Sequence, residues 1–309
     1  MSRSLTIAII AISMACGGGS SPEAGPPPVG SATAKGSAAP APVPPPIPTC
    51  EQVTFAETTT LPEASGATWL ADGGLIVIAD SGHDGAYVVL DPETGKERES
   101  GKLPIGSGTD DIEGLAMWNG KLVGISSAGW IRVWQKTGAS YALVEGPYPL
   151  GPVNLPDKGY ADADDPGMVC SERKTNCGRD YEGICLAAGS DQCAGFALAK
   201  ADGALYCLRD QAGKLVVDRS VSIKIGKRGA LADCTISDRG ELFVGANLFD
   251  AANVYRVTNW MDPAKAHVDK LGSLGIGFNE VIAARGEMIY RLSDTGGDGP
   301  SLMTKYRCR

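Results

Sequence analysis

The segment Glu63–Gly82, EASGATWLADGGLIVIADSG, decides the fold, because its pattern returns four more times along the chain. Each copy begins near an acidic residue or its equivalent, and a few residues later an apolar strand, a turn and a second apolar strand follow. Short strands rich in Ile, Val and Leu that alternate with Gly-containing turns are typical of antiparallel sheets. The four further copies span 111–130, 180–203, 231–250 and 278–297.

The spacing of the copies predicts a β-propeller. They start 48, 69, 51 and 47 residues apart, and a four-stranded blade takes roughly 40 to 50 residues. More strand-like sequence follows each copy, and sustained helical periodicity is absent. We therefore expect an all-β propeller with five blades. The long second interval leaves a degenerate sixth blade open, but we interpret residues 145–178 as an insertion because 151–167 contain no apolar run.

A lone strand precedes the first copy. Residues 50–59, CEQVTFAETT, are expected to complete the outer edge of the last blade, so that strands from both ends of the folded region share one sheet. Cys50 and Cys308 then lie at the two joined ends, and we predict that they form a disulfide. Such a bond closes a very long loop and strongly constrains the unfolded chain.

The cysteine count indicates an oxidising compartment. Nine cysteines are present, and setting Cys16 aside leaves eight, which is enough for four disulfides. Cys170 and Cys177 are expected to pair locally. The remaining four allow three connectivities, of which we favour Cys185–Cys193 together with Cys207–Cys234.

The first residues predict export. Arg3 precedes an apolar run that is too short to span a bilayer, so residues 1–15 are interpreted as a signal peptide. Cys16 follows as in a bacterial lipobox, where this thiol is acylated, although Ser13 replaces the usual aliphatic residue. We expect a lipid on Cys16 to attach the protein to a membrane of the cell envelope, outside the cytoplasm. A free or intermolecularly bonded Cys16 is the alternative.

Composition indicates how the chain is organised ahead of the propeller and which class of partner it excludes. Residues 16–49 are dominated by Gly, Ser, Ala and Pro, which predicts a disordered tether ahead of the propeller domain at 50–309. The formal charge of −8 argues against a nucleic-acid partner, because such binding needs basic surfaces that neutralise phosphates.

Acidic residues recur at the starts of the predicted inner strands, which face the centre of a propeller. We place Ser65, Glu113, Glu182, Asp233 and Glu280 at one equivalent position, with Asp111 and Asp180 two residues before the glutamates. Like charges brought together raise one another's pKa unless they are compensated. Ca²⁺, which takes six to eight oxygen ligands, would compensate them. Lysines, water or backbone N–H groups are alternatives, and each acid could instead act within its own blade.

Three further groups are candidates. The basic residues before the fourth copy could bind phosphate or another anion, although an ordinary solvated loop is favoured; they are Lys224, Lys227 and Arg228. His83, with Asp80 and Ser81, could transfer protons, but a solvated His in an Asp-Gly turn is favoured, and His267 is expected at the surface. The acids Asp162, Asp164 and Asp165 do not fit a calcium-binding EF-hand, because Arg173 stands where that loop needs Glu.

The phrases at the copies resemble those of the SdiA-regulated and esterase-like phytase-domain propellers. The resemblance rests on Glu63-Ala-Ser-Gly66, Asp111-Ile-Glu-Gly114 and Asp180-Tyr-Glu-Gly183, and it covers roughly residues 55–300. It implies the propeller fold firmly and an activity only loosely, because one fold supports many functions. The fourth and fifth copies depart from it.

The leading functional hypothesis is a lipid-anchored scaffold that binds a small molecule, a glycan or a protein through one face of the propeller, with Ca²⁺ at its centre. The alternatives are a metal-dependent phosphoesterase and a lactonase-like hydrolase. Binding is preferred because the five repeat positions are chemically uneven and no nucleophile–base pair is evident.

Overall fold

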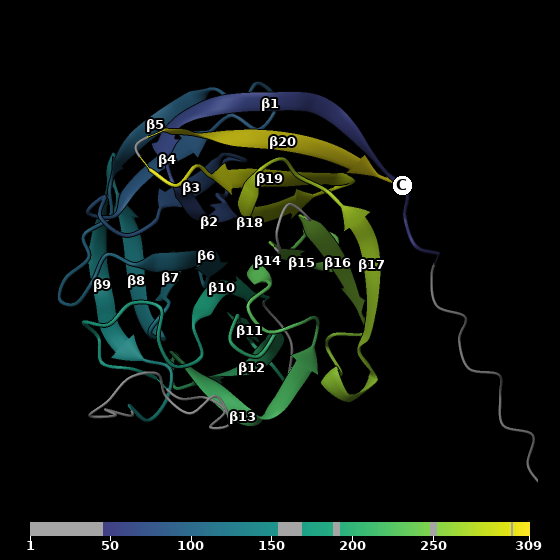
Figure 1. Ribbon diagram of the computed structural model, residues 1–309. Helices are drawn as coiled ribbons and strands as arrows, with labels where there is room; N and C mark the ends of the chain where they lie inside the picture. Colours follow the sequence, from purple (N-terminus) through teal and green to yellow (C-terminus); the bar gives the residue numbers. More distant parts are fainter. Residues whose placement is uncertain (1–45, 154–168, 188–191, 248–251, 298) are drawn as a thin grey trace, which may run out of the picture. The chain divides into compact units, whose positions relative to one another are not determined.

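The computed structural model describes residues 46–153, 169–187, 192–247, 252–297 and 299–309. These residues form five antiparallel sheets of four strands each. The sheets are arranged around a central axis as the blades of a propeller (Figure 1). The five-bladed fold predicted from the repeat is confirmed.

Four blades are continuous in sequence, and each runs from an inner to an outer strand. Blade 1 consists of β2 (Ala64–Trp69), β3 (Leu75–Ala79), β4 (Ala86–Leu90) and β5 (Glu97–Lys102). Blade 2 consists of β6 (Ile112–Trp118), β7 (Lys121–Ser126), β8 (Trp130–Thr137) and β9 (Ser140–Pro149). Blade 3 consists of β10 (Tyr181–Leu186), β11 (Gly195–Ala199), β12 (Ala204–Gln211) and β13 (Lys214–Lys224). Blade 4 consists of β14 (Leu231–Ile236), β15 (Leu242–Ala246), β16 (Asn253–Thr258) and β17 (His267–Ser273), with a short 3₁₀ turn at Pro263–Lys265.

Blade 5 is closed by the N-terminal strand, as predicted. From the axis outward, its first three strands are β18 (Phe278–Arg285), β19 (Met288–Asp294) and β20 (Pro300–Cys308). The fourth and outermost strand is β1 (Cys50–Pro62), which pairs antiparallel with β20. Cys50 lies opposite Cys308 in this register, and the two form the predicted disulfide. Figure 1 shows β1 and β20 side by side along the outer edge of the ring.

The apolar core is divided among the blade interfaces. Separate buried clusters lie between each pair of neighbouring blades, including the pair formed by blades 5 and 1. Since the clusters close into a ring, every blade buries both faces of its sheet. This explains why the middle strands, such as β3 and β11, are buried along their whole length rather than alternating.

Two details of the sequence interpretation are corrected. The predicted insertion starts too early, because residues 145–149 belong to β9. The second pair of disulfides is Cys185–Cys234 and Cys193–Cys207, with Cys170–Cys177 as predicted. Cys185 and Cys234 lie on β10 and β14, the inner strands of adjacent blades, so this bond joins blade 3 to blade 4. The favoured pairing of Cys185 with Cys193 and of Cys207 with Cys234 is therefore wrong, because Cys185 pairs with Cys234 on the inner strand of the neighbouring blade.

Glycines allow the inner strands to approach one another closely. A Cβ atom on Gly66 would lie 2.7 Å from the Cα atom of Gly114, and one on Gly114 would lie 2.7 Å from the Cα atom of Gly183. Both distances are shorter than real Cβ atoms tolerate. Gly66 and Gly114, which follow Ser65 and Glu113, are therefore packing requirements, and they set how closely the starts of the inner strands approach one another.

Candidate functional site

A β-bulge at the start of each inner strand creates one set of equivalent positions. Register shifts leave one residue of each inner strand without an opposite partner on the second strand. The residues at this bulge position are Ser65, Glu113, Glu182, Ala232 and Glu280.

A second set lies at or directly after the end of the second strand of each blade, beside the bulge. The residues at this strand-end position are Asp80, Ser127, Lys200, Asn247 and Asp294. Both sets lie at the end of the axis where the inner strands begin, which we call the acidic end.

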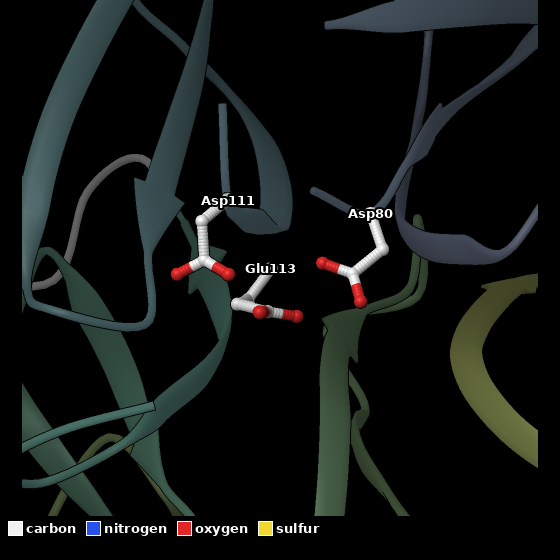
Figure 2. Close-up of side chains that lie close together, drawn as sticks. All are labelled: Asp80, Asp111 and Glu113. Atoms are coloured by element: carbon white, nitrogen blue, oxygen red, sulfur yellow. The ribbon is translucent and has the colours of Figure 1, made fainter. Parts of the chain in front are cut away.

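Three carboxylates meet at the acidic end. Asp80 from blade 1 and Asp111 and Glu113 from blade 2 each offer an oxygen, and these oxygens lie within 4.8 Å of one another. Figure 2 shows the Asp80 carboxylate facing those of Asp111 and Glu113 across the gap between the two blades. Asp111 and Glu113 are buried, and Asp80 is partly buried. This group, the acidic trio, is the only one of its kind among the described residues.

Hydroxyl and backbone groups hold the trio in place. Ser65 Oγ donates a hydrogen bond of 2.6 Å to Glu113 Oε2, from blade 1 to blade 2. Ser127 Oγ donates to Asp111 Oδ2. The backbone N–H of Ser81 donates to Asp80 Oδ1 at 2.5 Å. These donors orient the carboxylates without adding a positive charge.

The trio is electrostatically strained. Burial raises the pKa of Glu113 well above its ordinary value, and the charges of Glu182, Asp80 and Asp111 raise it further. Burial is also the main cause that raises the pKa of Asp80 to about 6 and that of Asp111 above its usual range. Perturbed acids of this kind are concentrated at functional sites, and a bound cation would relieve the strain.

Lys200 compensates the neighbouring acids on blade 3. Its ammonium group lies 3.0 Å from Glu182 Oε2, and the Glu182 side chain is only 3% exposed. Burial lowers the pKa of Lys200, but the charge and hydrogen bond of Glu182 outweigh it and raise the pKa above its ordinary value. Burial raises the pKa of Glu280 to about 7, although the charge of Lys200 opposes this.

Asp233 does not occupy the position that the sequence predicted for it. The bulge of blade 4 falls on Ala232, so Asp233 is equivalent to Gly66, Gly114 and Gly183. Its Oδ1 accepts a hydrogen bond from the backbone N–H of Cys234 at 2.7 Å, and its Oδ2 accepts one from Ile282 at 3.1 Å. Asp233 therefore links β14 to β18 rather than joining the trio.

The remaining predicted residues are not members of the trio. His83 Nε2 lies 2.8 Å from Glu63 Oε2, and this pair borders the trio, because the backbone N–H of Asp80 donates to the carbonyl of Glu63 at 2.8 Å. Asp84, in the same loop, forms an exposed ion pair with Lys102. Asp162, Asp164 and Asp165 lie outside the described residues, as do Cys16 and the predicted signal peptide.

The basic group is exposed and bonds to a neighbouring turn. Lys224 Nζ donates to the carbonyl of Asp202, and Arg228 Nε donates to that of Ala201 at 2.8 Å. Lys227 is exposed. The turn follows β11, so all three cations lie near Lys200 on the side of blades 3 and 4.

Sequence reasoning missed Asp80 as a partner of Asp111 and Glu113, and it missed Lys200 entirely. Both occupy the strand-end position, which immediately follows the apolar second strand of each copy. Aligning the copies on that boundary would have shown Asp80, Ser127 and Lys200 in one column.

The other end of the axis is different in character. A pocket of about 360 Å³ opens there, formed by the last residues of the inner strands. Its rim carries Trp69, Met117, Leu186 and Ile236, with Arg285 stacked on the Trp69 ring at 5.3 Å. The lining also contains polar residues, among them Ser237 and Asp238.

No protein-family model matches the chain, and no curated protein matches it in sequence. Solved structures do match its fold. A PQQ-bound aldose sugar dehydrogenase from Streptomyces coelicolor aligns over 86% of this chain and 100% of that chain, with 13% identity and a TM-score of 0.51. At this identity the likeness shows the fold alone.

Two further structures are similar over comparable lengths. A glutaminyl cyclase from Myxococcus xanthus shares 15% identity over 85% of this chain and 98% of that chain, with a TM-score of 0.48. A virginiamycin B lyase from Staphylococcus aureus shares 11% identity over 84% of this chain and 99% of that chain, with a TM-score of 0.43.

Four disulfides indicate an oxidising compartment outside the cytoplasm. In the part of the chain that the structure describes, no helix is long and apolar enough to cross a membrane.

Proposed function

We propose that this propeller is an extracytoplasmic binding protein that holds Ca²⁺ at the acidic trio and uses the ion to bind an anionic ligand. The observation that supports the proposal is the convergence of Asp80, Asp111 and Glu113 from two blades, with neutral hydrogen-bond donors rather than cations as their partners. Three carboxylates offer the hard oxygen ligands that Ca²⁺ prefers, and water or the ligand would supply the rest.

The surroundings of the trio fit an anionic ligand. An ion bound there would present positive charge at the acidic end, and the basic residues Lys224, Lys227 and Arg228 lie at the same end of the axis. A lipid on Cys16 would hold this binding surface at a membrane, and this part of the proposal rests on the sequence alone.

The test is calorimetry of the purified protein with Ca²⁺. We expect one bound ion per chain, and we expect Asp80→Asn and Glu113→Gln each to weaken binding at least about tenfold, since each removes a charged ligand. Asp84→Asn is the matched control, because Asp84 lies on the same loop as Asp80 but pairs with Lys102. The proposal fails if the protein binds no ion, or if all three variants bind as the wild type does.

The second candidate function is a metal-dependent hydrolase of phosphate esters or lactones. It is favoured by the pKa of Asp80, about 6, and of Glu280, about 7, because groups that titrate near neutral pH can accept and return protons in catalysis. A bound ion would polarise the scissile bond. The same variants, assayed with p-nitrophenyl phosphate and a simple lactone, decide between binding and turnover. The family resemblance, which includes phytase-like proteins, stays a prediction.

A further inference from the structure

The end of the axis opposite the acids has a cavity of its own. Residues of all five inner strands, β2, β6, β10, β14 and β18, line it, and its volume is about 360 Å³. Because every blade contributes to it, the cavity lies on the axis of the propeller, and we call it the axial pocket. Pockets of about 300–1,000 Å³ hold small organic ligands in other proteins, so the axial pocket has room for a small one.

The axial pocket begins where the close contact between inner strands ends. On blades 2 and 3 its lining starts at Leu115 and Ile184, which directly follow Gly114 and Gly183. A Cβ atom on Gly114 would lie 2.7 Å from the Cα atom of Gly183, so the two backbones are in contact at these glycines. None of the trio residues lines the pocket, and the two are therefore separate sites.

One repeat position provides the apolar wall of the pocket. Three residues after the position of Gly66, four blades carry a large apolar side chain, and these are Trp69, Met117, Leu186 and Ile236. All four are only partly buried. Blade 5 has the small Ala284 at this position, and the indole N–H of Trp69 donates to its carbonyl at 2.9 Å. Trp69 is therefore held against blade 5 and gives the wall a fixed aromatic surface.

A cation stands at the edge of this wall. Arg285 is exposed, and its guanidinium carbon lies 5.3 Å from the centre of the Trp69 ring. Its Nη1 donates to the carbonyl of Gly73 at 3.4 Å, and it forms no ion pair with any residue that the structure describes. Asp238 also lines the pocket, but its Oδ1 accepts a hydrogen bond from the backbone N–H of Gly286 at 2.7 Å. The charge of Arg285 is thus available to an anionic group of a ligand.

We propose that the axial pocket binds a small organic acid, whose apolar body packs against Trp69 and Met117 while its anionic group pairs with Arg285. This site goes beyond the proposed cation site and does not depend on it. Burial of the apolar body supplies most of the affinity, and Arg285 selects for the negative charge. Asp238 weakens this selection, because its own charge repels an anion.

Two fluorescent probes that differ in one charged group test the proposal. Anilinonaphthalene sulfonate carries an anionic group, and phenylnaphthylamine has the same aromatic body without it. In a chelating buffer, which keeps the cation site empty, we expect the wild type to bind one molecule of either probe per chain. Arg285→Gln should weaken binding of the sulfonate at least about fivefold and change that of the neutral probe by less than about twofold. Asp238→Asn should act in the opposite direction and strengthen binding of the sulfonate by about twofold.

Matched controls exist for the charge and for the apolar wall. Arg98→Gln removes a partly exposed guanidinium from β5, the outer strand of blade 1, and should bind both probes as the wild type does. Met117→Ser removes part of the wall and should weaken both probes about fivefold. Phe278→Ser is its control, because the side chain of Phe278 is 53% exposed at the start of β18, at the acidic end. We expect Phe278→Ser to bind both probes as the wild type does.

Three outcomes would overturn the proposal: no binding of either probe by the folded protein, equal affinity of the wild type and Arg285→Gln for the sulfonate, or a loss in Phe278→Ser as large as that in Met117→Ser. The last would mean that the probes bind an exposed apolar patch. If Met117→Ser does not fold, Ile236→Ser tests the same wall. A loss confined to Arg285→Gln and the wall variants supports the axial pocket whether or not the trio binds Ca²⁺, so the two proposals stand or fall separately.

Discussion

Asp233 and Glu113 show how one residue of register changes what a carboxylate does. Glu113 stands on the bulge of its strand, points to the acidic end and shares its surroundings with Asp80 and Asp111. Asp233 stands one position further along its strand and accepts two backbone hydrogen bonds instead. Burial raises its pKa, although the N–H groups of Ile282 and Cys234 act in the opposite direction. Its role is to join blade 4 to blade 5.

Replacing Asp233 tests this role. Asp233→Ala leaves the N–H groups of Cys234 and Ile282 buried without an acceptor, so we expect the free energy of unfolding to fall by about 2–4 kcal/mol. Asp233→Asn keeps an acceptor oxygen and should lose less. Denaturant unfolding measures both, and calorimetry should find Ca²⁺ binding intact. A loss of Ca²⁺ affinity as large as that of Glu113→Gln would return Asp233 to the metal site.

At the scale of the strand, the close approach of β6 to β10 depends on the absence of a side chain. A Cβ atom on Gly114 would lie 2.6 Å from the backbone nitrogen of Ile184, and neither backbone can yield without disturbing its own sheet. The repeated Glu-Gly pair therefore joins two requirements. The acid supplies charge at the acidic end, and the glycine brings the next acid close to it.

Gly114→Ala should therefore destabilise the protein. We expect a loss of about 1–3 kcal/mol in the free energy of unfolding, as for overpacking elsewhere in protein cores. Gly226→Ala is the control, since its new Cβ atom would meet only Leu231 Cδ2, at an ordinary 3.4 Å. Thermal or denaturant unfolding compares the two. Equal stability of the two variants would show that the inner strands can separate at little cost.

The strands themselves could be predicted from the sequence, because apolar runs between Gly-containing turns depend only on local composition. The strand-like sequence that follows the copies includes residues 141–146, 214–220 and 267–273, which lie in β9, β13 and β17. The pairing of Cys185 with Cys234 could not be predicted, because it depends on which blades are adjacent. The position of Asp233 could not be predicted from an alignment on the acidic residues, because in the fourth copy Ala232 takes the bulge position and Asp233 stands where the first three copies have glycine.

For the whole molecule, the buried acids make stability depend on pH. The pKa of Glu280 is about 7 in the folded protein against an ordinary value of 4.5, and that of Asp80 is about 6 against 3.8. The folded state therefore holds protons that the unfolded state has already lost between these values. The contribution of both groups to stability is fully present below their unfolded pKa values and is lost as the pH rises through the folded ones.

We accordingly expect the Ca²⁺-free protein to be less stable at pH 8 than at pH 5. Thermal unfolding across this range in a chelating buffer measures the effect. Glu280→Gln should flatten the profile, because the amide does not titrate. Ca²⁺ should stabilise the protein most at the higher pH, where the trio is ionised. A stability that rises from pH 5 to pH 8 without Ca²⁺ would contradict the assignment of these acids.

The closure of blade 5 has a mechanical consequence. Thr49 and Arg309 exchange two backbone hydrogen bonds beside the Cys50–Cys308 bond, so the two ends of the ring leave it at one point. A pull on the chain ahead of Thr49 loads the covalent S–S bond before it reaches the hydrogen bonds between β1 and β20. Tension at this end therefore cannot separate β1 from β20 one hydrogen bond at a time while the disulfide is intact. Once that bond is reduced, only hydrogen bonds and packing hold β1 to β20 at this end, so β1 would be the first strand to detach under tension.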